Sequence, residues 1–140
     1  MKIFVNLPVA DLDRSKRFFE ALGYHFNQQF TDPTAACLVF SEDIFAMLMT
    51  HEKFRGFSPN PICDPKKSTE MLICLSADSR AQVDEIVRQA VAAGGSTYNE
   101  PQDHGFMYGH GFQDPDGHVW ELCWMDPAVI QPDPQLAQQQ

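Results

Sequence analysis

The order of strand and helix patterns constrains the fold of this 140-residue chain most strongly, because one order occurs twice. The first half predicts a strand over residues 2–9, a helix that Asp11 caps and Gly23 ends, and then three short strands. The same order returns from residue 71, where we expect Asp78 to cap the second helix. A repeated βαβββ unit indicates an internal duplication, and therefore an α+β protein built from two related modules.

The chain length fits one domain made of both modules. We expect that domain over residues 1–127, with module one at about 1–58 and module two at about 70–126. A connector rich in proline separates the modules. Residues 128–140 contain Pro-Asp-Pro and end in three glutamines, which predicts a flexible tail.

Charge and cysteine usage exclude several classes of function. Ten Lys and Arg against nineteen Asp and Glu give a net charge of −9, which argues against nucleic acid or an anionic membrane as a partner. The N-terminus enters a strand pattern without a long apolar segment, so we expect a cytoplasmic protein. The four cysteines form no Cys-x-x-Cys pair, which favours buried thiols over disulfides or a zinc site.

The last two strands of module two place the candidate site. We expect strands over Ser96–Asn99, Met107–Gln113 and His118–Met125, the last two joined by the turn sequence Asp-Pro-Asp-Gly. A turn closed around the Pro-Asp pair sets His110 opposite Glu121, with their Cβ atoms about 4.5–5.5 Å apart. That register puts the side chains of two aromatic residues on the same face, which reads as a pocket wall: Tyr108 and Phe112. Trp120 and its alternating neighbours then face the core.

Two motifs carry a family resemblance over about residues 2–126. The chain opens with Asn6-Leu-Pro-Val-Ala-Asp-Leu-Asp and closes module two with Asp114-Pro-Asp-Gly-His-Val-Trp-Glu121. Together with the doubled βαβββ unit, these resemble the vicinal oxygen chelate superfamily, which includes glyoxalase I, bleomycin-resistance proteins, fosfomycin-resistance enzymes and extradiol dioxygenases. The resemblance implies a mixed sheet curled around a cavity, helices on the outer face, and a homodimer. It also implies a divalent metal ion in those members that use one.

The metal-ligand positions of the family are mostly apolar in this chain. Matched residue by residue, they fall at Phe4, near Leu48, at Leu72 and at Glu121, and only Glu121 keeps a ligand side chain. One carboxylate does not hold a transition metal, since catalytic sites of this kind use at least three protein ligands. The standard site is therefore largely lost, and the cofactor is either none or a divalent transition metal. A metal would require a non-standard site of Glu121 and His110, with Asn6 or His51 added.

Two functions fit this pattern. The first is a glyoxalase-like enzyme of lyase, isomerase or dioxygenase type that acts on a small molecule, with Glu121 as general base, His110 orienting it and Tyr108 donating to an oxyanion. The second is a metal-free binding or sequestering protein of the bleomycin-resistance type. The alternative interpretation of these residues is structural: His110 and Glu121 form a polar pair in a cleft wall, and Tyr108 is an aromatic wall. The predicted substrate-binding residues are Asn6, Phe4, Leu72, Cys74 and Phe112.

The segment that precedes the pocket strand also has two interpretations. Residues 99–111 mix three glycines with His, Asp and aromatic side chains. A mobile lid over the cavity has this composition, and so has an ordinary surface connection whose glycines serve turns.

Overall fold

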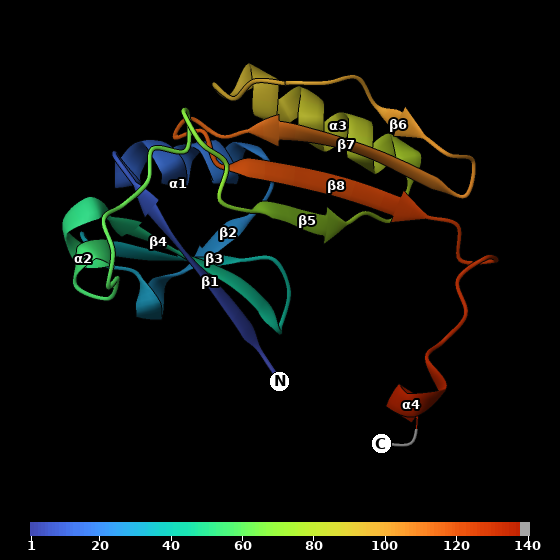
Figure 1. Ribbon diagram of the computed structural model, residues 1–140, viewed down its shortest axis with the longest axis horizontal. Helices are drawn as coiled ribbons and strands as arrows, with labels where there is room; N and C mark the ends of the chain where they lie inside the picture. The colour runs from blue at the N-terminus through green and yellow to red at the C-terminus, as the bar shows by residue number, and fades with distance from the viewer. Residues whose placement is uncertain (138–140) are drawn as a thin grey trace.

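Two four-stranded mixed sheets form the protein, which a computed structural model describes over residues 1–137. The strand orders are β1-β4-β3-β2 and β5-β8-β7-β6, so β1 and β5 are edge strands. In each sheet the first and last strands of a βαβββ unit pair in parallel, and the rest pair antiparallel. This confirms the expected α+β fold of two related modules (Figure 1).

The first sheet and its connections contain these elements: β1 Ile3–Val9, α1 Leu12–Ala21, β2 His25–Asn27, the 3-10 turn η1 Gln28–Phe30, β3 Ala35–Val39, β4 Ile44–Thr50 and α2 His51–Arg55. The second sheet and the C-terminal segment contain these: β5 Leu72–Ser76, α3 Arg80–Ala92, β6 Gln102–Asp103, β7 Met107–Gln113, β8 Val119–Met125 and α4 Pro134–Ala137. Residues 56–71, which we call the linker, connect α2 to β5. None of the helices within residues 1–137 is long and apolar enough to cross a membrane.

The helix ends follow the predicted chemistry, with one correction. The carboxylate of Asp11 accepts a hydrogen bond from the backbone N–H of Arg14, as expected for a helix cap. In module two the cap is Ser79 rather than Asp78, because the Ser79 hydroxyl accepts from the N–H of Gln82. The two residues are adjacent and both are good caps, so composition alone could not separate them.

The strand predicted over Ser96–Asn99 is wrong. Only Ser96 forms a bridge, to Gln113, and the edge strand is β6 at Gln102–Asp103 instead. The predicted tail contains a short helix, α4, and its residues 138–140 lie outside the described part of the chain. Figure 1 shows this C-terminal segment running away from the end of β8.

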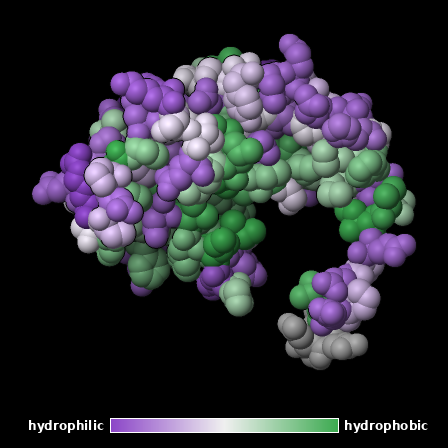
Figure 2. Space-filling view, in the orientation of Figure 1, coloured by the Kyte–Doolittle hydropathy of each residue, from purple (hydrophilic) through white to green (hydrophobic). Residues whose placement is uncertain are grey.

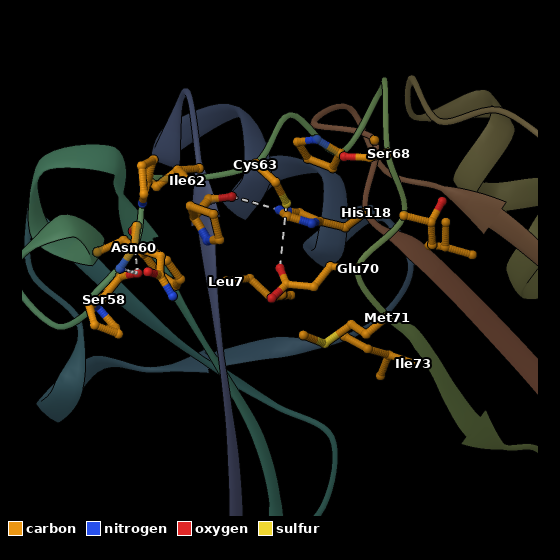
Figure 3. A pocket seen from close by; sticks show the side chains of 18 residues that line it. Leu7, Ser58, Asn60, Ile62, Cys63, Ser68, Glu70, Met71, Ile73 and His118 are labelled. Atoms are coloured by element: carbon orange, nitrogen blue, oxygen red, sulfur yellow. Dashed lines mark hydrogen bonds between the residues drawn. The ribbon is translucent and has the colours of Figure 1, made fainter.

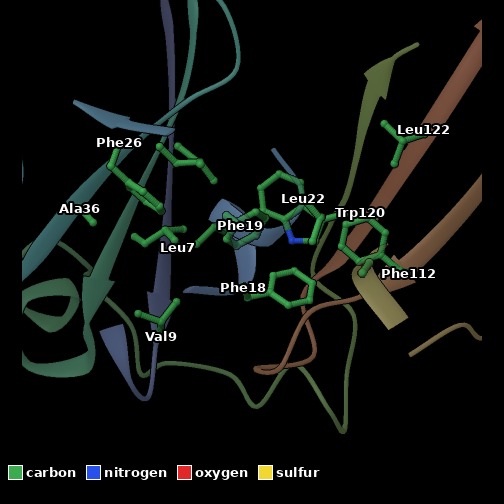
Figure 4. Close-up of a cluster of buried hydrophobic side chains, with 14 of the residues drawn as sticks. Leu7, Val9, Phe18, Phe19, Leu22, Phe26, Ala36, Phe112, Trp120 and Leu122 are labelled. Carbon is green, nitrogen blue, oxygen red and sulfur yellow. The ribbon is translucent and has the colours of Figure 1, made fainter. Parts of the chain in front are cut away.

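The core lies between the helices and the inner faces of both sheets (Figure 4). Aromatic side chains join the two modules there. The ring of Phe18 on α1 lies 5.9 Å from that of Phe112 on β7, and the ring of Phe19 lies 5.2 Å from that of Trp120 on β8. Because aromatic side chains each bury about 150–250 Å², these pairs supply much of the apolar contact between the modules.

A buried carboxylate provides polar contacts between the modules. Asp116, in the hairpin loop of module two, accepts hydrogen bonds from the Ala10 N–H at 2.8 Å, the Ser15 hydroxyl at 3.2 Å and the Arg14 guanidinium at 3.2 Å. All three donors belong to module one. We call these four residues the latch. It fixes the hairpin loop of module two against the start of α1.

A second buried carboxylate shapes the loop that carries the latch. Asp114 accepts from the indole N–H of Trp120 and from the backbone N–H groups of Asp116 and His118, each at 3.0 Å. Burial raises the pKa of Asp114. The Asp-Pro-Asp-Gly sequence thus has a structural task in both of its carboxylates.

Candidate functional site

The hairpin of β7 and β8 has a different register from the predicted one. His110 lies opposite Leu122, and Glu121 lies opposite Gly111. The predicted pairing of His110 with Glu121 is therefore wrong by one residue. The loop is the reason: Asp114 pairs with His118, which leaves three loop residues, and the third, Gly117, has a φ of +98°. A type I turn followed by a glycine at positive φ is a common three-residue hairpin loop.

A slip of one residue moves every side chain of a strand to the other face. Phe112, predicted to bind substrate, is only 2% exposed in the core. Tyr108 donates its hydroxyl to Asp84 on α3, so it holds the hairpin to the helix rather than facing Glu121. His110 hydrogen-bonds through Nε2 to the backbone oxygen of Asn99 at 2.8 Å. The register thus puts these three side chains on the opposite face of the sheet from Glu121, although His110 is still among the residues that line the pocket beside Glu121.

An arginine further explains why Tyr108 lies on the helix side. The Arg80 guanidinium stacks over the rings of Tyr108 and Trp124, at 5.3 and 5.1 Å from their centroids. Arg80 also pairs with Asp103 at 2.7 Å. These contacts tie α3 to the segment before β7, which supports the ordinary-connection interpretation of residues 99–111 over the mobile lid.

Glu121 lies on the outer face of the second sheet, away from the helices. Its neighbours on the flanking strands are Cys74 on β5 and Gly111 on β7. Because the opposite residue is a glycine, no side chain covers Glu121 from β7. A pocket of about 230 Å³ occupies this space, and we call it the Glu121 pocket. Its lining side chains include Tyr98, Gln102, Met107 and Cys123.

Two thiols lie beside the carboxylate. The pKa of Cys74 is raised to about 11, first by desolvation and then by the nearby Cys123 and Glu121. The Cys74 thiol therefore stays protonated at neutral pH, where it is a weak donor and a poor nucleophile. The structure places Cys74 next to Glu121 in the strand register and in the lining of the same pocket.

Tyr98 is one of the pocket residues that the sequence did not indicate. It comes from the irregular segment after α3, and its pKa is raised by desolvation and then by the charge of Glu121 and by Cys74. Its hydroxyl lies so close to Gly111 that a Cβ at that position would collide with it. The two glycines of β7, Gly109 and Gly111, were the available signal, because alternating glycines remove side chains from one face of a strand.

The remaining predicted binding residues lie outside the Glu121 pocket but on exposed sheet surface. Phe4 on β1 is 51% exposed and stacks on Phe45 of β4 with ring centroids 4.8 Å apart. Asn6 is exposed on the same side of β1. Leu72, two residues before Cys74 on β5, is 59% exposed. Leu48 differs, since it is fully buried in the core and lines no groove.

The donor set does not fit the divalent metal that the resemblance implies. Among residues 1–137 no group of three or more His, Cys, Asp or Glu side chains lies close enough together to hold a metal ion. The family positions are taken by a stacked ring at Phe4, a core residue at Leu48 and an exposed aliphatic chain at Leu72. The non-standard pair does not provide a metal site either, because the side chains of His110 and Glu121 belong to opposite faces of the second sheet.

The chemistry available in the Glu121 pocket is therefore limited. One carboxylate can accept hydrogen bonds, balance a positive charge or take up a proton, and Tyr98 can donate through its hydroxyl. Thiols, glycines and Met107 supply an apolar surface around them. This combination suits recognition of an apolar ligand that carries a donor or a positive charge.

The chain resembles a known family model in its N-terminal part and solved structures over most of its length. A family model described as bleomycin resistance protein-like N-terminal matches residues 3–41, which cover β1, α1, β2 and β3. No curated protein shows significant similarity to this chain.

Solved structures match over most of the chain. A hypothetical protein from S. aureus is 26% identical, covers 89% of this chain and 93% of its own, and has a TM-score of 0.76. A glyoxalase/bleomycin resistance protein/dioxygenase family enzyme from Burkholderia phytofirmans is 19% identical, with 87% and 96% covered and a TM-score of 0.72. A bleomycin resistance determinant encoded on transposon Tn5 is 23% identical, with 90% and 98% covered and a TM-score of 0.62. These likenesses establish a common fold.

Proposed function

We propose that this chain, which has the fold of the vicinal oxygen chelate superfamily and a bleomycin-resistance-like N-terminal module, binds a small molecule without the help of a transition metal. The ligand lies against the outer face of the second sheet, where Glu121 is the single carboxylate of the pocket. Apolar contacts supply most of the affinity, and Glu121 selects for a ligand that carries a donor or a positive charge.

One observation carries this proposal. The positions that hold metal ligands in other members are occupied by Phe4 and Leu72, and both are more than half exposed. Burying such a side chain contributes about 1.5–3 kcal/mol. Figure 2 shows apolar side chains around the hollow between the body of the molecule and the C-terminal segment. Exposed apolar surface beside a pocket is typical of ligand-binding sites.

The test is a titration with Nile red, an uncharged dye whose emission reports apolar surroundings, in buffer that contains EDTA. We expect saturable binding by the parent protein. Leu72→Asp should weaken it at least tenfold, because a charge on this surface must be desolvated when the dye binds. Val91→Asp is the matched control, since Val91 is 47% exposed on α3, which covers the other face of the sheet.

Equal weakening by both substitutions, or binding that appears only after a divalent metal is added, would contradict the proposal. Circular dichroism of each variant separates lost binding from lost folding. Glu121→Gln is expected to keep most of the affinity for this neutral dye.

The second candidate is a glyoxalase-like enzyme, and the environment of Glu121 favours it. The carboxylate is partly buried between a glycine and a thiol, and Tyr98 stands within its electrostatic influence. A carboxylate in such a place can act as a general base toward a bound substrate. In that case Glu121→Gln abolishes turnover while the fold and ligand binding remain.

We also expect a homodimer. Exposed apolar side chains gather at the start of the first sheet and along the segment after β8, including Ile3, Ile44, Val129 and Ile130. Such residues commonly become buried between subunits. A monomeric mass by light scattering at micromolar concentration would contradict this expectation.

A further inference from the structure

A second cavity is separate from the Glu121 pocket. It has a volume of about 490 Å³, within the range of about 300–1,000 Å³ that small-molecule sites occupy. Its floor comes from both modules, with Leu7 and Pro8 of β1 and Ile73 of β5. The linker crosses above these edge strands and forms the opposite wall. We call this cavity the junction pocket (Figure 3).

The linker is held in place beside the cavity. Gly117 of the hairpin loop lies so close to the linker that a Cβ there would be 2.8 Å from Cγ of Lys66 and 3.1 Å from its backbone nitrogen. The next linker residues turn back on Asp64, whose backbone oxygen accepts from the N–H groups of Lys67 and Ser68 at 3.0 Å. The contact between Lys66 and Gly117 therefore holds the linker above the floor of the cavity. The cavity is present without a ligand.

Rigid apolar side chains make up much of the cavity wall. Three prolines of the linker line it, and proline fixes the backbone φ and offers no N–H to the cavity. Phe54, Ile62 and Met71 add aromatic and aliphatic surface. A wall of this kind favours a compact apolar body over a polar sugar or a phosphate.

The charged group on the wall is Glu70. Its carboxylate accepts from the thiol of Cys63, with Oε2 and Sγ 3.6 Å apart, and Figure 3 shows the two side chains pointing toward one another. Desolvation, followed by this hydrogen bond, raises the pKa of Cys63, so the thiol keeps its proton at neutral pH. A thiol is a weak donor, and the carboxylate retains most of its capacity to accept.

His118 lies on the floor of the junction pocket, and a hydrogen bond fixes the position and the tautomer of its imidazole. Its Nε2 lies 2.7 Å from the backbone oxygen of Pro8, and because a carbonyl oxygen only accepts, Nε2 carries the proton. This contact uses a backbone acceptor on the open edge of β1 and joins the residue before β8 to β1. The imidazole is thereby positioned by both modules and can stack on a flat ligand.

We propose that the junction pocket is a second ligand site, which takes a small organic cation with a flat apolar body. The cationic group pairs with Glu70, and the body lies between the linker prolines and the β1 and β5 floor. A ligand there contacts both modules and the linker at once. This site is independent of the function proposed for the Glu121 pocket.

The test uses three matched probes that share one ring system: 1-naphthylmethylamine, the neutral 1-naphthalenemethanol and the anionic 1-naphthoate. Each is titrated into isotope-labelled protein and followed by amide chemical shifts. We expect saturable binding of the amine at least tenfold tighter than of the alcohol, with shifts at Cys63, Ile73 and Val119. Glu70→Gln should reduce the preference for the amine, measured at these three amides, to less than threefold.

The outcomes separate the two sites. Shifts confined to Cys74, Tyr98 and Gly109 would place the amine in the Glu121 pocket and overturn the proposal. So would an amine that binds no tighter than the alcohol, or a preference that survives Glu70→Gln. Glu42→Gln serves as the control for charge alone, because Glu42 lies in the exposed loop between β3 and β4.

Discussion

Replacing Asp116 with alanine is expected to lower the free energy of unfolding by about 3 kcal/mol. The substitution removes one acceptor but leaves its donors on Ala10, Arg14 and Ser15 without a partner. Breaking a buried ion pair from one side costs about 3–5 kcal/mol, and we take the lower end because the Arg14 side chain is 39% exposed while that of Asp116 is 6% exposed. Urea denaturation followed by tryptophan fluorescence measures the change.

Asp43→Ala is the control for this substitution. Asp43 pairs with Lys2 at 3.2 Å, but both side chains are more than half exposed. Exposed pairs contribute about 0–1 kcal/mol, so this variant should unfold almost as the parent does. Asp116→Asn keeps the shape and removes the charge, and we expect an intermediate loss. A loss in Asp116→Ala no larger than that in Asp43→Ala would show that the latch contributes little to stability.

Gly117→Ala is expected to cost about 3 kcal/mol, because two effects add at this position. The φ of +98° is unfavourable for a residue with a Cβ, at about 1–2 kcal/mol. The new methyl group would also stand 2.8–3.1 Å from atoms of Lys66 and Pro65, and two of these atoms belong to the backbone. Overpacking of this kind costs about 1–3 kcal/mol.

Gly94→Ala isolates the first of these effects. Gly94 has a φ of +112°, and a Cβ there would meet nothing within 4 Å. We expect a loss of about 1–2 kcal/mol from backbone strain alone. The difference between the two variants in urea denaturation measures the contact between linker and hairpin. Equal losses would mean that the linker moves aside without cost, and the junction pocket would then lack a fixed wall.

Local sequence chemistry was sufficient to predict the fold. The Asp11 cap, the glycines after α1 and α3, and the strand and helix order apart from the Ser96–Asn99 strand follow from short-range preferences and are found in the structure. The motif around Asp114 also carried the family resemblance. Its contribution to the latch depends on residues about a hundred positions away, which no local pattern reveals.

The candidate site was harder to predict, because it depended on one loop. Asp-Pro-Asp-Gly is compatible with a two-residue and a three-residue connection, and the glycine at positive φ with the Asp114–His118 pair selects the longer one. Because the loop is one residue longer than predicted, the side chains of His110 and Tyr108 lie on the opposite face of the sheet from that of Glu121. The position of Cys74 beside Glu121 does not depend on this loop, because it follows from the parallel pairing of β5 with β8.

The latch also makes the two modules different from each other. Module two carries Asp116 in its hairpin loop, while the corresponding β3–β4 loop of module one holds Asp43 at the surface, paired with Lys2. Module two therefore supplies the acceptor of the latch, and module one supplies its donors. Two copies of module one would lack the acceptor, and two copies of module two would lack its donors. At this contact the two halves are therefore complementary rather than interchangeable.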